Sequence, residues 1–289
     1  MTGFSADWLA MRAPFDDAAR SPALARAFAA LLPADPFLVD LGSGSGAARR
    51  ALAPILAGTP RWTLLDNDPA LLRQALVGGT RSRAVKRHLN SRVDDILDMG
   101  HEGVTAFSLL DLGGLGWIGR LARSVARRGL PFYAPLIVDG RIAWSPADPD
   151  DRFVIGLFAA HQRRAKGLGP ALGAAAPAWT ARAFRRCGYR VASAPSDWRI
   201  PANGRPMLAA MIAGAEAAAT EQSPAARGRI AAWAARRRDD LAAGRLSLTV
   251  GHRDLLAWRP GNEPAGHAVS RRTGARPDQT TKASGEAWA

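Results

Sequence analysis

The amino-acid sequence predicts an α/β protein built on a doubly wound, mostly parallel sheet, and residues 37–76 carry the evidence. An apolar run at 37–41 leads directly into the turn Gly42-Ser43-Gly44-Ser45-Gly46, and a helical pattern follows at 47–56. A second apolar run at 62–66 ends in an acid and precedes another helix. The order strand, glycine turn, helix, strand is the opening of this class of sheet.

Residues 1–34 precede this unit and read as N-terminal helices. Pro14 is expected to interrupt the first run. The second helix begins after Ser21, a favourable helix cap, with Pro22 in the first helical position. Large apolar residues then recur three and four positions apart, which is the helical spacing. We therefore expect two short helices ahead of the first strand.

The alternation of strands and helices continues toward the C-terminus. Apolar runs predict further strands at 85–93, 104–110, 131–138, 189–192 and 246–258. The last of these is expected to run antiparallel to the others, so that the sheet is mostly but not wholly parallel. Two alanine-rich stretches before it, at 206–221 and 225–241, read as helices.

Residues 141–175 break the alternation and predict a helical insertion after the fifth strand. Asp139-Gly140 is a strong turn signal and favours a hairpin where the insertion begins. A helix to about Gln162 and a glycine-rich loop at 166–170 follow, and we interpret the insertion as a lid over the sheet. One catalytic domain, 1–260, is therefore expected, followed by a polar, disordered tail at 261–289.

Composition limits the class of protein. The 289 residues include 39 basic and 25 acidic side chains, a net charge of +14, which favours an anionic partner. The basic residues are almost all arginines and are spread along the chain, so a generally basic surface is preferred over a dedicated nucleic-acid stripe. A single cysteine, Cys187, excludes a disulfide framework and a cysteine-built zinc site, and we expect no metal.

The chain shows neither a membrane-spanning run nor a signal peptide. No apolar stretch approaches the ~20 residues that a membrane helix needs. The first twelve residues include Asp7 and lack the basic-then-apolar order of a signal peptide. We expect a cytoplasmic protein with no membrane partner.

Acids flank the glycine turn, and they sharpen a motif that would be weak alone. Asp40 lies two residues before Gly42, and Asp66 ends the next strand, where an acid commonly accepts hydrogen bonds from ribose hydroxyls. Gly42, Gly44 and Ala47 also satisfy the nicotinamide-binding pattern. A carboxylate at position 40 would repel a pyrophosphate and attract an amino group. The site therefore suits a cofactor with a ribose and a cationic end.

These motifs resemble those of the class I S-adenosylmethionine-dependent methyltransferases, which have a Rossmann-like fold. Val39 to Gly46 (VDLGSGSG) is similar to the first motif of that family and Leu64 to Pro69 (LLDNDP) to the second. Val93 to Met99 and Phe107 to Leu112 are weaker counterparts of the third and fourth. The resemblance covers about 35–140, and the late segments look like an uncharacterised bacterial branch of the family.

The resemblance implies roles by position. Asp40 would face the amino group of S-adenosylmethionine and Asp66 its ribose hydroxyls, with Asn67 near the adenine face. Either Asp94 or Asp95 would reach the adenine amino group, with Asp95 slightly favoured, although a helix cap explains both acids equally well. The remaining cofactor-binding candidates are Gly42, Ser43, Gly44 and Gly46.

The acceptor would lie over the ends of the fourth and fifth strands. The candidates for catalysis are Asp111, His161 and Tyr133, and those for substrate binding are Arg141, Trp144, Lys166 and Trp198. Each also has an ordinary structural explanation: a helix cap for Asp111, burial for the tryptophans, and a solvated surface for the basic residues. His252 falls in the predicted last strand, where we expect a structural role.

The leading hypothesis is a methyltransferase that acts on a small, possibly anionic molecule, with transfer to an oxygen or nitrogen. It predicts a pocket of ligand size between 139–170 and the glycine turn. The alternatives are an RNA methyltransferase that uses the basic surface, favoured by the net charge, and a non-catalytic protein that binds the cofactor. A nicotinamide dehydrogenase is a distant fourth possibility.

Overall fold

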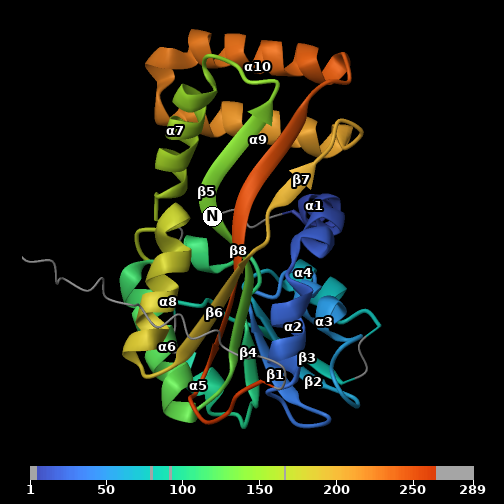
Figure 1. Cartoon of the computed structure of the whole chain (residues 1–289), viewed down its shortest axis with the longest axis vertical. Coiled ribbons are helices and arrows are strands. Elements are labelled where there is room, and N and C mark those ends of the chain that lie inside the picture. Colours follow the sequence, from blue (N-terminus) through green and yellow to red (C-terminus); the bar gives the residue numbers. More distant parts are fainter. Residues whose placement is uncertain (1–4, 79–80, 91–92, 166, 265–289) are drawn as a thin grey trace, which may run out of the picture.

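The protein was studied as a computed structural model, which describes residues 5–78, 81–90, 93–165 and 167–264 (Figure 1). Lys166 and most of the predicted tail lie outside these residues. The central sheet has the strand order β3-β2-β1-β4-β5-β8-β6, and β7 pairs with β8 outside this path. The strands are β1 (Phe37–Leu41), β2 (Arg61–Asp66), β3 (Ser82–Lys86), β4 (Gly103–Thr105), β5 (Phe132–Ser145), β6 (Arg190–Pro195), β7 (Trp198–Ile200) and β8 (Ser247–Trp258).

This topology confirms the predicted fold class. Strands β1 to β5 are mutually parallel, and β8 runs antiparallel to both β5 and β6. It is the Rossmann-like sheet of the methyltransferase fold. Strand β4 ends earlier than expected, at Thr105, so Asp111 lies in a short 3₁₀ turn, η1 (Leu110–Leu112), and not at the strand's end.

Helices cover both faces of the sheet because each buried strand alternates its side chains between them. The side chains of Leu38 and Leu64 lie on one face of the sheet. This face is covered by α2 (Pro22–Ala29), α3 (Ala47–Leu52) and α4 (Pro69–Ala75). The neighbouring residues Val39 and Leu65 pack with the other face. That face carries α5 (Val93–Leu97), α6 (Leu115–Arg128) and α8 (Ala176–Arg186).

Strand β5 shows that the hairpin predicted at Asp139-Gly140 is wrong. The strand continues through this dipeptide to Ser145, which pairs with Ser247 of β8. Gly140 has a φ of +87°, and the register with β8 shifts between Val138 and Ile142. Asp139-Gly140 therefore forms a β-bulge, which bends the strand without reversing its direction.

The extended halves of β5 and β8 carry a second group of elements, called here the upper lobe (Figure 1). It consists of these strand ends, β7, α7 (Asp151–Gln162), α9 (Arg205–Gln222), η3 (Pro224–Ala226) and α10 (Arg227–Ala242). A third hydrophobic core, which includes Trp144, Trp198 and Trp233, fills it. The predicted insertion at 141–175 is thus one part of a larger structure, because 141–145 extend β5 and both late helices pack against the same core.

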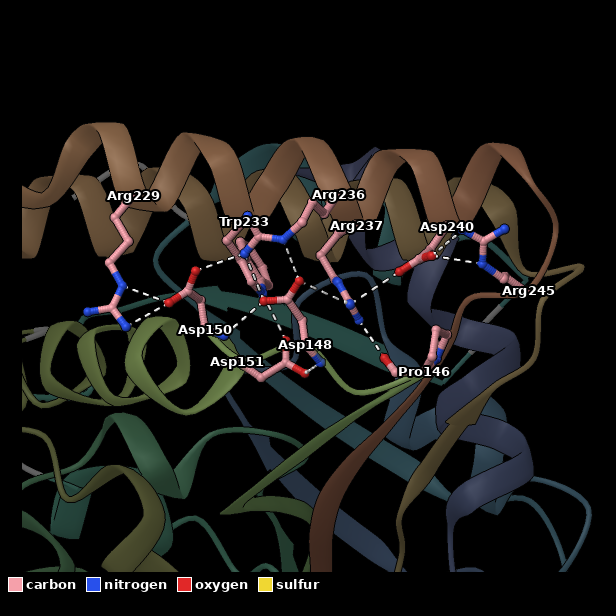
Figure 2. A network of polar contacts seen from close by, with 10 residues as sticks. All are labelled: Pro146, Asp148, Asp150, Asp151, Arg229, Trp233, Arg236, Arg237, Asp240 and Arg245. Atoms are coloured by element: carbon pink, nitrogen blue, oxygen red, sulfur yellow. Dashed lines mark hydrogen bonds and ion pairs between the residues drawn. The ribbon is translucent and has the colours of Figure 1, made fainter.

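A network of ion pairs fastens α10 to the loop before α7 (Figure 2). Arg236 bonds Asp148 and Asp150, and Arg229 bonds Asp150. Arg237 is the buried member, with 2% of its surface exposed, and it contacts the Pro146 carbonyl at 2.6 Å and the carboxylates of Asp148 and Asp240. Removing Arg237 takes the donor from the Pro146 carbonyl and takes from Asp148 and Asp240 the buried one of their two arginine partners, so we expect the upper lobe to depend on this arginine.

Arg237→Ala should therefore lower the free energy of unfolding by about 3–5 kcal/mol, as measured by urea denaturation. The side chain of the neighbouring Arg238 is 51% exposed, and among the described residues it pairs with Glu216. Arg238→Ala removes the same charge and should cost less than about 1 kcal/mol. Equal losses in the two variants would show that the network does not stabilise the lobe.

Candidate active site

The glycine turn folds into a backbone cradle between β1 and α3. Gly42, Gly44 and Gly46 have backbone φ values of +67°, +50° and +85°, which residues with a Cβ rarely adopt. The N–H of Ser43 bonds the carbonyl of Leu65 at 2.8 Å and so ties the turn to β2. Each glycine is thus required by backbone conformation, and the turn brings its amides to the carboxyl edge of the sheet.

Asp66 holds the same turn from the end of β2. Its carboxylate accepts the N–H of Gly44 at 2.8 Å and that of Asp68 at 3.0 Å. A carboxylate offers about four acceptor positions, so about two remain for a ligand's hydroxyls. Asn67, next in the chain, is exposed beside it. The structure thus leaves room for the ribose-binding role that the sequence implies.

Asp40 lies beneath the turn and is 1% exposed. One carboxylate oxygen, Oδ1, accepts the hydroxyl of Thr105 at 2.7 Å, while Oδ2 has no hydrogen-bond partner among the described residues. Burial, reinforced by the nearby charge of Asp66, raises the pKa of Asp40 to about 7. The buried Oγ of Ser43 also lacks a partner in this part of the chain. Unpaired buried polar atoms of this kind are uncommon in proteins, and a water molecule or a ligand can satisfy them.

The two acids after β3 are placed differently. Asp94 is bound by Ser124, Arg127 and Arg128 of α6. Asp95 lies 3.7 Å from Arg87, whose backbone N–H bonds the carbonyl of Asp66. Of the two acids, Asp95 is therefore the one linked through Arg87 to the end of β2, and its adenine-binding role stays a prediction.

Helix α1 (Ala6–Ala19) covers the site, which the sequence did not indicate. Cδ1 of Leu9 lies 3.2 Å from the place where a Cβ on Gly44 would be. Arg12 donates to the hydroxyl of Ser108 in the loop after β4 at 2.7 Å, and Asp16 accepts from Trp198 of β7 at 2.9 Å. Pro14, expected to interrupt this helix, lies inside it, between these two anchored residues.

Polar groups from several elements meet beneath α1. Ser108 has a φ of +49°, a strained value for a residue with a side chain and one that clusters at functional sites. Asp111 is half-buried, and this burial raises its pKa to about 6, although the positive charge of Arg12 works in the opposite direction. His252 is 2% exposed, and its ring lies 4.7 Å from that of Trp198.

The state of His252 follows from its contacts. Its Nδ1 lies 3.0 Å from the carbonyl of Val250, which can only accept, so the proton is on Nδ1. Burial lowers the pKa of the ring to about 4, and Nε2 therefore carries a lone pair at neutral pH. The sequence suggested only a structural role for this residue.

Tyr133 does not have the predicted catalytic placement. It is fully buried, and its hydroxyl donates to Asp254 at 3.2 Å. Phe28 stacks on its ring at 5.5 Å, and Phe107 meets the ring edge-on at 5.7 Å. Burial raises its pKa well above the usual value, so it cannot act as a base near neutral pH. Tyr133 packs the core of the sheet.

The remaining candidates lie in or near the upper lobe. His161 of α7 bonds Glu221 of α9 at 3.0 Å. Arg141 is paired with both Asp139 and Asp197, so its charge is already matched. Trp144 is 6% exposed and packs edge-on against Trp233.

Burial explains both of the tryptophans predicted to bind substrate. Trp198 is 4% exposed and bonded to Asp16, as described above. Lys166, the fourth such candidate, lies outside the described residues. Within the described chain, the polar groups beneath α1 are thus better placed for an acceptor than the substrate-binding residues expected from the sequence.

A pocket of about 480 Å³ lies between the first turn of α6 and the loop 167–172, and neither Ser108, Asp111 nor His252 is among the residues that line it. The loop is held by hydrogen bonds from Gly114 to Leu168 and from Leu172 to Gly113. The pocket has the volume of a small-molecule site. One wall belongs to the predicted lid, as expected, but the other is α6 and not the glycine turn, over which α1 lies.

Comparison with known proteins bears on the fold. No protein-family model matches the chain, and no curated protein matches it. A cyclopropane-fatty-acyl-phospholipid synthase-like protein from Lactobacillus casei is similar at 18% identity, over 89% of this chain and 96% of that chain, with a TM-score of 0.53. A methyltransferase from Geobacter sulfurreducens, solved with S-adenosylhomocysteine, is 18% identical over 90% of this chain and 100% of its own, with a TM-score of 0.46. Structural neighbours are thus methyltransferases and cyclopropane synthases at low identity, and the likeness is one of fold.

The burial of Asp40 predicts how stability depends on pH. Its pKa of about 7 in the folded protein lies above the ordinary value of 3.8, so the folded chain binds more protons than the unfolded chain between these values. The free energy of unfolding should therefore fall as pH rises from about 4 to about 7. Asp40→Asn keeps an acceptor for Thr105 and removes the titrating group. The contribution of Asp40 to the fall in the free energy of unfolding should therefore be absent in this variant. At about pH 8 it should exceed the wild type in thermal stability, and parallel pH profiles would contradict this account.

Proposed function

We propose that this protein is an S-adenosylmethionine-dependent methyltransferase that acts on a small molecule. The observation that carries the proposal is the unpartnered Oδ2 of Asp40, a buried carboxylate oxygen beneath a glycine turn that Asp66 holds from the next strand. A cofactor with an ammonium group and a ribose satisfies both acids. A pyrophosphate would place negative charge against Asp40, which argues against a nicotinamide cofactor.

The residues fit such a cofactor in charge and in hydrogen-bonding capacity. Asp40 would neutralise the ammonium group, Asp66 would accept from the ribose hydroxyls, and Ser43 would complete the cradle. Asp95 would take the adenine amino group. When bound, S-adenosylmethionine supplies a methyl group on a sulfonium for in-line transfer. The chain's own contribution is to orient the acceptor and to exclude water, which α1 favours by lying over the turn.

Asp111 is the best-placed proton acceptor. Its pKa of about 6 means that it is mostly ionised at neutral pH yet basic enough to take a proton from an acceptor's hydroxyl or amine. The lone pair on Nε2 of His252 would accept a hydrogen bond from the same group and so hold its orientation. Arg12, bonded to Ser108, ties the loop after β4 to α1.

The pocket beside α6 supports a small acceptor. Its volume of about 480 Å³ suits a single small molecule. The RNA methyltransferase and the non-catalytic cofactor-binding protein are kept as outcomes of the following test.

The test is transfer of a labelled methyl group from S-adenosylmethionine into a cell extract that has been separated into low-mass and RNA fractions. We expect label in the low-mass fraction and a rate about 100-fold lower for Asp111→Asn, the loss typical of a missing proton acceptor. Asp239→Asn, a matched change at an exposed site on α10, should leave the rate unchanged. Label in the RNA fraction alone would contradict the small-molecule proposal. Cofactor binding without label in either fraction would contradict catalysis.

A further inference from the structure

The pocket between α6 and the loop 167–172 is walled mainly by apolar side chains. Trp117 is 2% exposed and donates its indole N–H to a backbone carbonyl at 2.7 Å, so its ring is fixed in the wall. Leu115 is 53% exposed at the start of α6, and Leu168 and Leu172 line the pocket from the loop. Like every other helix in the described ranges, α6 is too short or too polar to cross a bilayer. The apolar walls suit the body of a small ligand.

The loop lies close to α6 because Gly114, which precedes the helix, has no side chain. A Cβ on Gly114 would come within 2.9 Å of the carbonyl oxygen of Pro170 and 3.1 Å of that of Leu168. The N–H of Gly114 donates to the same Leu168 carbonyl at 3.0 Å. The pocket is therefore held open by backbone contacts, and its side chains are left to meet a ligand.

Arg120 carries the charge of this pocket. Of the residues that line the pocket, all of which are described, none is acidic and Arg120 is the one basic residue. Its guanidinium lies back over the first turn of α6, with Nη1 3.5 Å from the place where a Cβ on Gly116 would be. Within the described chain Arg120 forms no ion pair, and α6 contains no acid. The pocket thus joins an apolar wall to one unmatched positive charge.

The pocket also lies near the candidate proton acceptor. Asp111 precedes Gly114 by three residues, so their Cα atoms are at most about 11 Å apart. Both follow β4 at the carboxyl edge of the sheet, the edge at which sheets of this kind bind their ligands. A molecule that spans this distance can offer one group to Asp111 and another to Arg120.

We propose that the methyl acceptor is a small molecule with an apolar body and one anionic group, which seats its body in the pocket and its anionic group at Arg120. The inference rests on the proposed function, since only a methyltransferase has such an acceptor. A neutral molecule would leave the arginine unmatched, and a cation would be repelled by it. A molecule with many charges would gain nothing from the apolar walls. Arg120 thus takes the role that the sequence suggested for Arg141.

A second hollow on α6 lacks these features. It has a volume of about 370 Å³ and is lined by Arg123, Ala126, Arg127 and Cys187, which include no large apolar side chain. It lies farther along the helix, away from the carboxyl edge, and Arg127 is already paired with Asp94. Arg123 is otherwise like Arg120, because it is exposed and lies over a glycine, Gly119. It therefore provides a matched control.

The probe is anilinonaphthalene sulfonate, a fluorescent molecule with an apolar ring system and one sulfonate, titrated into the full chain without cofactor. Naphthoate should displace it, whereas naphthalenemethanol and naphthylmethylamine, which carry a neutral and a cationic group on the same rings, should not. Arg120→Gln should bind the probe about tenfold more weakly, the loss expected for one charge-assisted hydrogen bond. Leu115→Ser, which keeps every charge, should also weaken binding.

The control variant, Arg123→Gln, removes the same charge three residues along the same helix and should bind the probe like the wild type. Thermal melting should show that every variant is folded. Equal losses in the two arginine variants, or equal displacement by the three naphthalene compounds, would overturn the proposal. So would a folded wild type that does not bind the probe.

The labelled product provides the second test. In the extract assay described above, the low-mass label should be retained by an anion-exchange resin at neutral pH. Low-mass label that passes through the resin would overturn the inference and leave the proposed function in place. Anion-selective binding of the probe by a protein that transfers no label would contradict the proposed function, and with it the assignment of the pocket to an acceptor.

Discussion

The carboxylate of Asp40 is buried between parallel strands with Thr105 as its one hydrogen-bond partner in the described chain. An ionised carboxylate in such a place is costly unless another group pairs with it. The glycine turn above it has no side chain larger than serine, and Asp66 restrains that turn from the neighbouring strand. The glycine turn and Asp66 thus lie next to a buried carboxylate whose Oδ2 has no partner among the described residues.

Strands β5 and β8 connect this site to the upper lobe. Their extended halves carry β7 and the helices that hold Trp198 and, through it, Asp16 of α1. The position of α1 over the glycine turn thus depends on the packing of the lobe, and Cδ1 of Leu9 lies 3.2 Å from the place where a Cβ on Gly44 would be. The stability of the upper lobe and the covering of the candidate site are in this way linked through one helix.

Local patterns were enough to predict the sheet, the glycine turn and the two acids, since each depends on a few neighbouring residues. Patterns failed where distant contacts decide the outcome. Asp139-Gly140 is a turn by local preference, yet pairing with β8 carries the strand through it. Arg12 meets Ser108 across 96 positions, and nothing in the helical pattern of α1 marks that contact. Trp144 and Trp198 were predicted to bind substrate, but both are buried in the third core. Because the members of that core come from separate segments of the chain, local sequence does not reveal their burial.

The central claim is that Asp40 pairs with the ammonium group of the cofactor, and calorimetric titration with S-adenosylhomocysteine tests it most directly. Because the pKa of Asp40 is about 7, the affinity of the wild type should fall about tenfold for each pH unit below that value. Asp40→Asn should bind more weakly at high pH and show no such dependence, while Asp239→Asn should follow the wild type. Binding that is insensitive to pH in the wild type, or an unchanged affinity in Asp40→Asn, would contradict the account.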